Sequence, residues 1–206
     1  QPLSLLGSTG SIGTQALDII RRLGIQVKAL AAYRNIERLE QQIREFQPEF
    51  AAVYDVALAK ELKLRVADCS IRIGAGMDGL LEAAVLPGSE MMFNSVVGMV
   101  GLLPTLEAIQ AKKKIALANK ETLVAGGALV MEAAKKQGVP VYPVDSEHSA
   151  VFQCIQGCPE RKALKKLILT ASGGPFFGKS MKELEQVSPE QALKHPNWDM
   201  GAKITI

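Results

Sequence analysis

The amino-acid sequence predicts an α/β fold, in which a doubly wound parallel sheet is followed by part of a smaller α+β region. From residue 3 to residue 144, short apolar runs alternate with segments whose apolar residues recur at helical spacing. That alternation is typical of parallel strands with helices on both faces. Near residue 144 the segments become shorter and more polar. We therefore expect one domain over residues 1–142 and a second, partial domain over residues 143–206.

Apolar and β-branched runs predict strands, and apolar residues at positions i, i+3 and i+4 predict helices. The predicted strands span residues 3–6, 25–32, 50–54, 71–74, 90–97, 114–118, 139–144 and 167–172. The predicted helices span residues 16–23, 36–46, 56–64, 77–85, 102–111, 119–137, 151–156, 181–186 and 189–193. Asn35 is a suitable N-cap for the second helix, and Gly138 is a suitable C-cap for the helix that ends at residue 137.

The composition is that of an ordinary globular protein, with 48% apolar and 22% charged residues among 206. The formal net charge is +3, and no run of lysine and arginine is interleaved with aromatic residues. We therefore expect no nucleic-acid partner. No apolar run reaches about 18 residues, so we expect no membrane span.

The three cysteines are scattered and form no CxxC pair, which favours a reducing compartment. We expect a cytoplasmic protein, or a plastid protein if the source is a plant or alga. Cys154 and Cys158 lie four residues apart, a spacing compatible with packing on one helix face or with zinc. Without a second pair of ligands we interpret them as packing residues.

Three glycines, Gly7, Gly10 and Gly13, separate the first predicted strand from the first predicted helix. This is the arrangement of a dinucleotide-binding turn. In such a turn Gly7 allows the tight bend, Gly10 lets the backbone approach a pyrophosphate, and Gly13 lets the helix pack on the strand. The pyrophosphate lies at the helix N-terminus, where free N–H groups and the helix dipole favour an anion. A glycine-rich turn without a ligand is the alternative.

The segment after the second predicted strand favours NADP over NAD. In NAD-binding proteins a carboxylate that binds the ribose follows the glycine turn by about 20 residues. This sequence has Arg34 and Asn35 there instead, and a ribose 2′-phosphate needs a cation. A solvated arginine on a loop is the alternative.

Asp145 and Glu147 follow the strand predicted over residues 139–144. In extended backbone, residues two apart point the same way, and paired carboxylates suit a hard cation such as Mg²⁺ or Mn²⁺. In that geometry His148 points elsewhere. A complete site needs a third carboxylate, and none is convincing further along the chain. The spacing is equally compatible with acidic residues that cap a helix.

Lys120 lies between Asn119 and Glu121 at a predicted helix start, where it could hold a phosphate or polarise a carbonyl. A capping asparagine with a surface Lys–Glu pair is the alternative. Ser172, followed by two glycines, could form a backbone nest for a phosphate.

His195 and Trp198 lie in a loop flanked by proline and glycine. Trp198 is either a core residue or part of a lid over a ligand.

Five motifs resemble those of the 1-deoxy-D-xylulose 5-phosphate reductoisomerase family and occur in the same order. They are GSTGSIG at residues 7–13, LANKE at 117–121, PVDSEH at 143–148, SGGPF at 172–176 and HPNWxMG at 195–201. The resemblance covers essentially the whole chain, and the last four motifs together are highly specific. It implies an NADPH-binding Rossmann-like domain over residues 1–142 and part of a catalytic domain over residues 143–206.

The resemblance also implies a reaction. A ketose phosphate rearranges its carbon skeleton to an aldehyde, which NADPH reduces to 2-C-methyl-D-erythritol 4-phosphate in non-mevalonate isoprenoid synthesis. We expect this phosphorylated ketose as substrate, and a homodimer as the complete protein.

The resemblance further implies roles for individual residues. The NADPH site comprises Gly7, Thr9, Gly10, Ser11, Ile12, Gly13, Arg34, Asn35, Asn119, Glu121 and Gly201. The substrate contacts Lys120, Ser146, Glu147, Ser172, His195 and Trp198. Lys120, Glu147 and His195 are the expected catalytic residues, and Trp198 lies on a flap that closes over the substrate. Asp145 and Glu147 are the expected ligands of Mg²⁺, Mn²⁺ or Co²⁺.

Two departures from the family pattern matter. Tyr33 takes a place where the family commonly has glycine, which predicts a differently shaped loop at the ribose phosphate. The chain also stops where the family continues into a segment with the third metal carboxylate. We expect residues 1–206 to bind NADPH without catalysing the reaction. Another NADP-linked two-domain reductase, and a non-catalytic NADP-binding module, are the alternatives.

Overall fold

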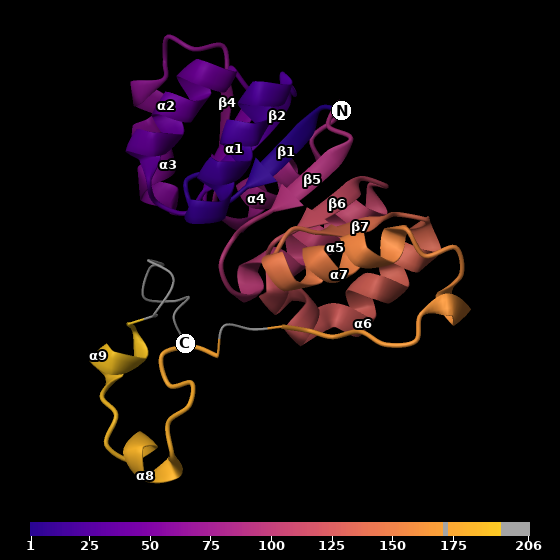
Figure 1. Ribbon diagram of the computed structural model, residues 1–206. Helices are drawn as coiled ribbons and strands as arrows, with labels where there is room; N and C mark the ends of the chain where they lie inside the picture. Colours follow the sequence, from indigo (N-terminus) through magenta and orange to yellow (C-terminus); the bar gives the residue numbers. More distant parts are fainter. Residues whose placement is uncertain (171–172, 195–206) are drawn as a thin grey trace. The chain divides into compact units, whose positions relative to one another are not determined.

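The computed structural model describes residues 1–170 and 173–194 of the chain (Figure 1). It contains two compact units, Gln1–Gln153 and Cys154–Ile206. The division falls inside a helix, beyond the domain boundary expected after residue 142, and that functional boundary stays a prediction. Within the described residues, no helix is both long and apolar enough to cross a bilayer.

The first unit is built on one parallel sheet of seven strands in the order β4-β3-β2-β1-β5-β6-β7. The strands are β1 (Leu3–Leu6), β2 (Val27–Ala32), β3 (Phe50–Val53), β4 (Arg72–Ala75), β5 (Met91–Asn94), β6 (Lys114–Leu117) and β7 (Val141–Pro143). The strand order reverses beside β1, which pairs with β2 on one side and with β5 on the other. In such sheets the ligand crevice lies outside the carboxyl ends of the strands at this reversal.

Helices cover both faces of the sheet (Figure 1). One face packs against α1 (Ser11–Leu23), α2 (Ile36–Phe46) and α3 (Val56–Arg65). The other packs against α4 (Gly76–Val85), α5 (Leu102–Gln110) and α6 (Lys120–Gln137), with the short 3₁₀ helix Met99–Gly101 before α5. The predicted α/β class and doubly wound parallel sheet are therefore confirmed.

Strand β1 shows why the sheet needs both layers. Leu3 and Leu5 are buried against the α1–α3 layer, whereas Leu6 is buried against the α4–α6 layer. Each buried leucine contributes about 1.5–3 kcal/mol through the apolar surface that it removes from water. Because successive side chains point to opposite faces, an apolar run of this kind is stable only between two helical layers.

Two predicted helix caps are confirmed by the structure. Helix α2 spans the predicted residues, and the Asn35 side chain accepts a hydrogen bond from the Arg38 N–H at 3.0 Å as its N-cap. Helix α6 ends at Gly138, whose φ of 67° is the left-handed conformation of a glycine C-cap.

Two predictions near the end of the chain are wrong. Helix α7 (Ser146–Gln156) begins five residues before the predicted residue 151. Residues 167–170 form no strand, and residues 171–172 lie outside the described part of the chain. Leu167, Ile168 and Leu169 are exposed. The run has strand-like composition, but the described residues offer it no neighbouring strand to pair with.

The remaining described elements of the second unit are short. They are the 3₁₀ helix Arg161–Ala163, α8 (Met181–Leu184) and α9 (Pro189–Ala192). Helices α8 and α9 each begin with a capping box, made by Ser180 with Glu183 and by Ser188 with Gln191. Both lie where helices are predicted, although each is shorter. No side chain is buried among residues 154–160, 162–170 and 173–194.

Candidate functional site

The predicted site residues of the first unit gather at one edge of the sheet. All seven strands are parallel, so their carboxyl ends share an edge. The glycine turn follows β1 there, and Arg34 follows β2. Lys120 follows β6, and Asp145 follows β7. The fold therefore brings together segments that are far apart in the sequence.

The glycine turn after β1 is tightly enclosed. Gly7 has a φ of 83°, and a Cβ there would lie 2.6 Å from the Ser95 carbonyl oxygen. A Cβ on Gly13 would lie 2.2 Å from the Gly7 carbonyl oxygen. Both distances are far below van der Waals contact, so only glycine fits at either position.

The amino end of α1 is open to an anion. Its N-cap is Gly10, which is exposed and provides no side-chain hydrogen bond. Ser11 and Ile12, the first residues of the helix, are exposed as well. The N–H groups of a first helical turn lack partners within the helix, and the helix dipole makes this end positive. The arrangement is that of a phosphate-binding helix N-terminus.

Two side chains of α2 reach the glycine turn, and sequence reasoning missed both. The Gln42 Nε2 donates to the Ser8 carbonyl oxygen at 2.9 Å, and the Ser8 hydroxyl donates to the Gln42 Oε1 at 2.7 Å. The Arg38 guanidinium donates to the Thr9 carbonyl oxygen at 3.2 Å. One signal was present in the sequence, because Gln42 is a polar residue on the apolar face of a predicted helix.

The loop after β2 carries the predicted phosphate-binding residues. Arg34 is largely exposed and forms an ion pair with Asp55 at 3.2 Å. Asp55 follows β3 and also caps α3 by accepting from the Ala57 N–H. Sequence reasoning weighed only residues near Arg34 in the chain and therefore missed this carboxylate. Such an exposed pair contributes about 0–1 kcal/mol, so an incoming phosphate can compete for Arg34.

A second contact joins the same two loops. The ring of Tyr33 packs on the ring of Tyr54 with centroids 5.8 Å apart. The Asp55 N–H donates to the Tyr33 carbonyl oxygen at 3.1 Å. The loop with Tyr33 is therefore held against the loop that follows β3.

Asn119 is a buried structural residue at the start of α6. Its side-chain oxygen accepts from the Thr122 N–H at 3.0 Å, which makes it the N-cap. Its Nδ2 donates to the carbonyl oxygens of Val96 and Gly98 and to the Glu121 carboxylate. The structure thus shows the capping alternative for Asn119. The cofactor roles of Asn119 and Glu121 stay predictions.

Asp145 lies directly before α7 rather than in an extended segment, so the expected extended geometry is wrong. Its Oδ1 accepts from the His148 N–H at 3.0 Å and lies 2.7 Å from the His148 Nδ1. His148 was expected to point elsewhere, and that expectation is wrong as well. The reason is that a helix beginning at Ser146 brings residues three apart together.

The charge on Asp145 is stabilised by its neighbours. Burial raises the pKa of its carboxyl, but hydrogen bonds from the His148 backbone and ring, with the charges of His148 and Lys120, outweigh burial. The pKa of Asp145 is held below its ordinary value. The charge of the predicted Lys120 therefore helps to lower the pKa of the predicted metal ligand. Ser146 and Glu147 are exposed in the first turn of α7.

Within the described residues, no three His, Cys, Asp or Glu side chains form a group that could hold a metal ion. Ser172, His195, Trp198 and Gly201 lie outside the described residues, so their predicted roles stay predictions. Cys154 is exposed, so its interpretation as a packing residue is wrong.

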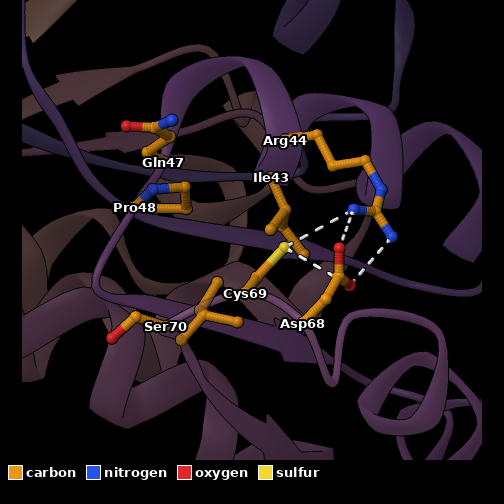
Figure 2. A pocket seen from close by; sticks show the side chains of 8 residues that line it. Ile43, Arg44, Gln47, Pro48, Asp68, Cys69 and Ser70 are labelled. Carbon is orange, nitrogen blue, oxygen red and sulfur yellow. Dashed lines mark hydrogen bonds and ion pairs between the residues drawn. The ribbon is translucent and has the colours of Figure 1, made fainter.

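A pocket of about 570 Å³ lies elsewhere in the first unit (Figure 2). Its residues precede β3 and β4, so it opens at the amino edge of the sheet, opposite the glycine turn. Arg44 is paired there with Asp68 at 2.7 Å and lies 3.7 Å from the Cys69 sulfur. This ion-paired pocket contains none of the predicted site residues.

Comparison with known proteins gives a family match over most of the chain. The model of 1-deoxy-D-xylulose 5-phosphate reductoisomerase matches residues 3–127, and that of the C-terminal domain of the same enzyme matches residues 141–206. Proteins of that name from Agathobacter rectalis and Lachnoclostridium phytofermentans are 54% and 55% identical over 205 residues. Each comparison covers 99% of this chain but 54% and 53% of the relative. The chain thus spans about half the length of these relatives.

Solved structures of the same enzyme also match this chain. A DOX-P reductoisomerase in complex with NADPH, fosmidomycin and magnesium matches 100% of this chain and 53% of its own, with a TM-score of 0.88 and 39% identity. The enzyme from Zymomonas mobilis in complex with NADPH matches 93% of this chain and 51% of its own, with a TM-score of 0.88 and 41% identity.

Proposed function

The chain belongs to the 1-deoxy-D-xylulose 5-phosphate reductoisomerase family, and we propose that the complete protein converts 1-deoxy-D-xylulose 5-phosphate to 2-C-methyl-D-erythritol 4-phosphate with NADPH and a divalent cation. One structural observation carries the cofactor part of the proposal. A helix N-terminus without a side-chain cap follows a glycine turn at the strand-order reversal, and the cationic Arg34 lies in the loop after the next strand. The relatives with solved structures bind NADPH and magnesium, which supports the same ligands here.

The residues at the turn fit NADPH. Gly10 is exposed, and an added Cβ there would be in van der Waals contact with the Gly7 carbonyl oxygen at 3.4 Å. Ser11 and Ile12 then present first-turn N–H groups to the pyrophosphate, and Thr9 lies beside them. Arg34 and Asn35 are proposed to bind the ribose 2′-phosphate, with Arg34 exchanging Asp55 for the phosphate.

The residues after β7 fit part of a divalent metal site. Asp145 and Glu147 offer carboxylate oxygens, which Mg²⁺ and Mn²⁺ prefer. When bound, such a cation supplies a Lewis acid and template for the oxygens of the substrate, and NADPH supplies the hydride. Burial raises the pKa of Asp145, but hydrogen bonds from His148 outweigh it and hold the pKa below its ordinary value, so the carboxylate stays available to a cation at neutral pH.

Other residues of the chain are proposed to bind and enclose the substrate. Lys120 is exposed at the start of α6, where its ammonium can hold the substrate next to Asp145. Ser146, Glu147, Ser172 and His195 are proposed to contact the substrate as well, with Lys120, Glu147 and His195 as catalytic residues. Trp198 is proposed to lie on a flap that excludes water from the reactive aldehyde. Asn119, Glu121 and Gly201 are proposed to line the cofactor site.

We also propose that the complete protein is a cytoplasmic homodimer that accepts Mn²⁺ or Co²⁺ in place of Mg²⁺. The three free cysteines suit a reducing compartment. The oxygen ligands of Asp145 and Glu147 suit all three cations. The dimer and the phosphorylated ketose substrate rest on family membership. Residues 1–206 alone are proposed to bind NADPH without turnover, because the described residues hold no group of three metal ligands.

NADPH oxidation with the ketose phosphate and Mg²⁺ tests this function. We expect turnover in a chain extended to the length of its relatives and none in residues 1–206. Asp145→Asn in the extended chain keeps a good helix N-cap but removes a metal-binding carboxylate, so turnover should fall at least about 100-fold while NADPH binding stays. Unchanged turnover of Asp145→Asn with Mg²⁺ would contradict the metal assignment. Equal turnover in both chain lengths would contradict the need for further residues.

A further inference from the structure

Gln42 of α2 is joined to the glycine turn by two hydrogen bonds, although 34 residues separate it from Ser8. We propose that Gln42 is a positioning residue for the pyrophosphate of the cofactor, because it fixes the direction of the Ser8–Thr9 peptide. The inference rests on the proposed binding of NADPH at this turn.

The two hydrogen bonds fix the orientation of the Gln42 amide. Ser8 is fully buried, and Gln42 is only 6% exposed. The Gln42 Nε2 donates to the Ser8 carbonyl oxygen at 2.9 Å, and its Oε1 accepts from the Ser8 hydroxyl at 2.7 Å. A flipped amide would place Oε1 against that carbonyl oxygen, so only this orientation satisfies both groups. Gln42 is therefore a fixed donor to one backbone carbonyl of the turn.

The direction of the Ser8 carbonyl also sets the direction of the Thr9 N–H, because both belong to the same peptide. In a planar trans peptide the C=O of one residue and the N–H of the next point in opposite directions. Because Gln42 holds the Ser8 carbonyl toward α2, the Thr9 N–H faces away from α2. Within the described residues, the Thr9 N–H has no hydrogen-bond partner. It is thus a fixed, available donor beside the open end of α1.

Hydrogen bonds also hold the neighbouring peptides of the glycine turn. The Arg38 guanidinium donates to the Thr9 carbonyl oxygen at 3.2 Å, and the Gly10 N–H donates to the Gly7 carbonyl oxygen at 3.1 Å. Helix α2 also carries Asn35 at its N-cap. The proposed 2′-phosphate residues Arg34 and Asn35 therefore directly precede α2, and the same helix holds the pyrophosphate turn through Arg38 and Gln42.

Removal of the Gln42 amide would leave the Ser8 carbonyl buried without a partner. A buried unpaired carbonyl is costly, so the peptide would rotate toward another donor and carry the Thr9 N–H with it. The loss of affinity should therefore arise at the pyrophosphate, and binding of the 2′-phosphate should be unchanged. A residue that merely supported the packing of α2 would weaken both.

Binding of two ligands to the 206-residue chain tests the inference. NADPH contains both phosphate groups, whereas adenosine 2′-monophosphate lacks the pyrophosphate. Gln42→Leu should raise the Kd of NADPH about tenfold and change the Kd of adenosine 2′-monophosphate less than about twofold. The matched control is Gln41→Leu, the same change at the exposed neighbouring position of α2. It should leave both Kd values unchanged.

A second variant separates the two hydrogen bonds. Ser8→Ala removes the hydroxyl but keeps the carbonyl, so it should weaken NADPH binding less than Gln42→Leu does. Equal weakening of both ligands by Gln42→Leu, or unchanged NADPH binding in the folded variant, would overturn the inference. Absence of NADPH binding by the unsubstituted chain would instead contradict the proposed function.

If Gln42→Leu does not fold, amide hydrogen exchange in the unsubstituted chain provides the test. NADPH should slow exchange of the Thr9 amide proton, and adenosine 2′-monophosphate should not. Thr9 exchange that NADPH leaves unchanged would overturn the inference.

Discussion

The turn after β1 and the turn after β7 lie at the same edge of the sheet but are held in different ways. Distant residues enclose the first: Gly7 lies against Ser95, and Ser8 is bonded to Gln42. The second depends on near neighbours, since Asp145 is bonded to His148 within the start of α7. The fold itself therefore builds the turn after β1, whereas the turn after β7 is set by local capping.

This difference has a functional consequence. A turn fixed by buried contacts can bind its ligand without rearrangement, which lowers the entropic cost of binding. In the proposed metal site, the partly buried Asp145 and the exposed Glu147 would supply two oxygen ligands and leave the rest of the coordination to other groups. We therefore expect cofactor binding to be independent of the metal in this chain.

We expect the largest loss of stability from a substitution in the enclosed glycine turn after β1. Gly13→Ala would place a Cβ 2.2 Å from the Gly7 carbonyl oxygen, so the unfolding free energy should fall by about 3 kcal/mol or more, with loss of NADPH binding. Urea unfolding followed by circular dichroism measures the change.

The matched control is Gly127→Ala in α6, where the nearest atom to an added Cβ is the Leu123 Cβ at 3.8 Å. Its stability should stay the same or rise by up to about 1 kcal/mol, because alanine favours the helix. Similar losses for both variants would show that the glycine turn is not specially enclosed.

We expect a smaller loss of stability from a substitution at Asp145, in the turn after β7. Asp145→Ala removes the cap of α7, so amide exchange within α7 should become faster by an amount equivalent to about 0.5–2 kcal/mol. The β1–β2 core should keep its protection, since the hydrogen bonds of the Asp145 side chain are made to His148 at the start of α7. Asp145→Asn retains a capping side chain and should change exchange little. Faster exchange throughout the sheet in Asp145→Ala would contradict local capping.

The sequence predicts the glycine turn well because its signal is local. Gly7, Gly10 and Gly13 lie between an apolar run and a helical pattern, and both flanking elements form as expected. The hydrogen bonds from Gln42 and Arg38 to the glycine turn could not be predicted, because they depend on how α2 packs beside β1.

The errors have physical reasons as well. Asp145 and Glu147 were expected in extended backbone, yet α7 begins at Ser146 because Asp145 is itself an effective cap. The apolar run over residues 167–170 has strand composition, but composition does not provide a pairing partner. Sequence thus predicts elements with local signals better than it predicts contacts between elements.

Calorimetric titration of the 206-residue chain with NADPH and NADH, each with and without Mg²⁺, tests whether the glycine turn and Arg34 form an NADPH site that needs no metal. NADPH should bind at least about tenfold more tightly than NADH, because Arg34 gains a charged partner in the 2′-phosphate. Mg²⁺ should change the Kd of NADPH less than about twofold. Equal affinity for the two cofactors, or NADPH binding only when Mg²⁺ is present, would show that this site is wrongly assigned.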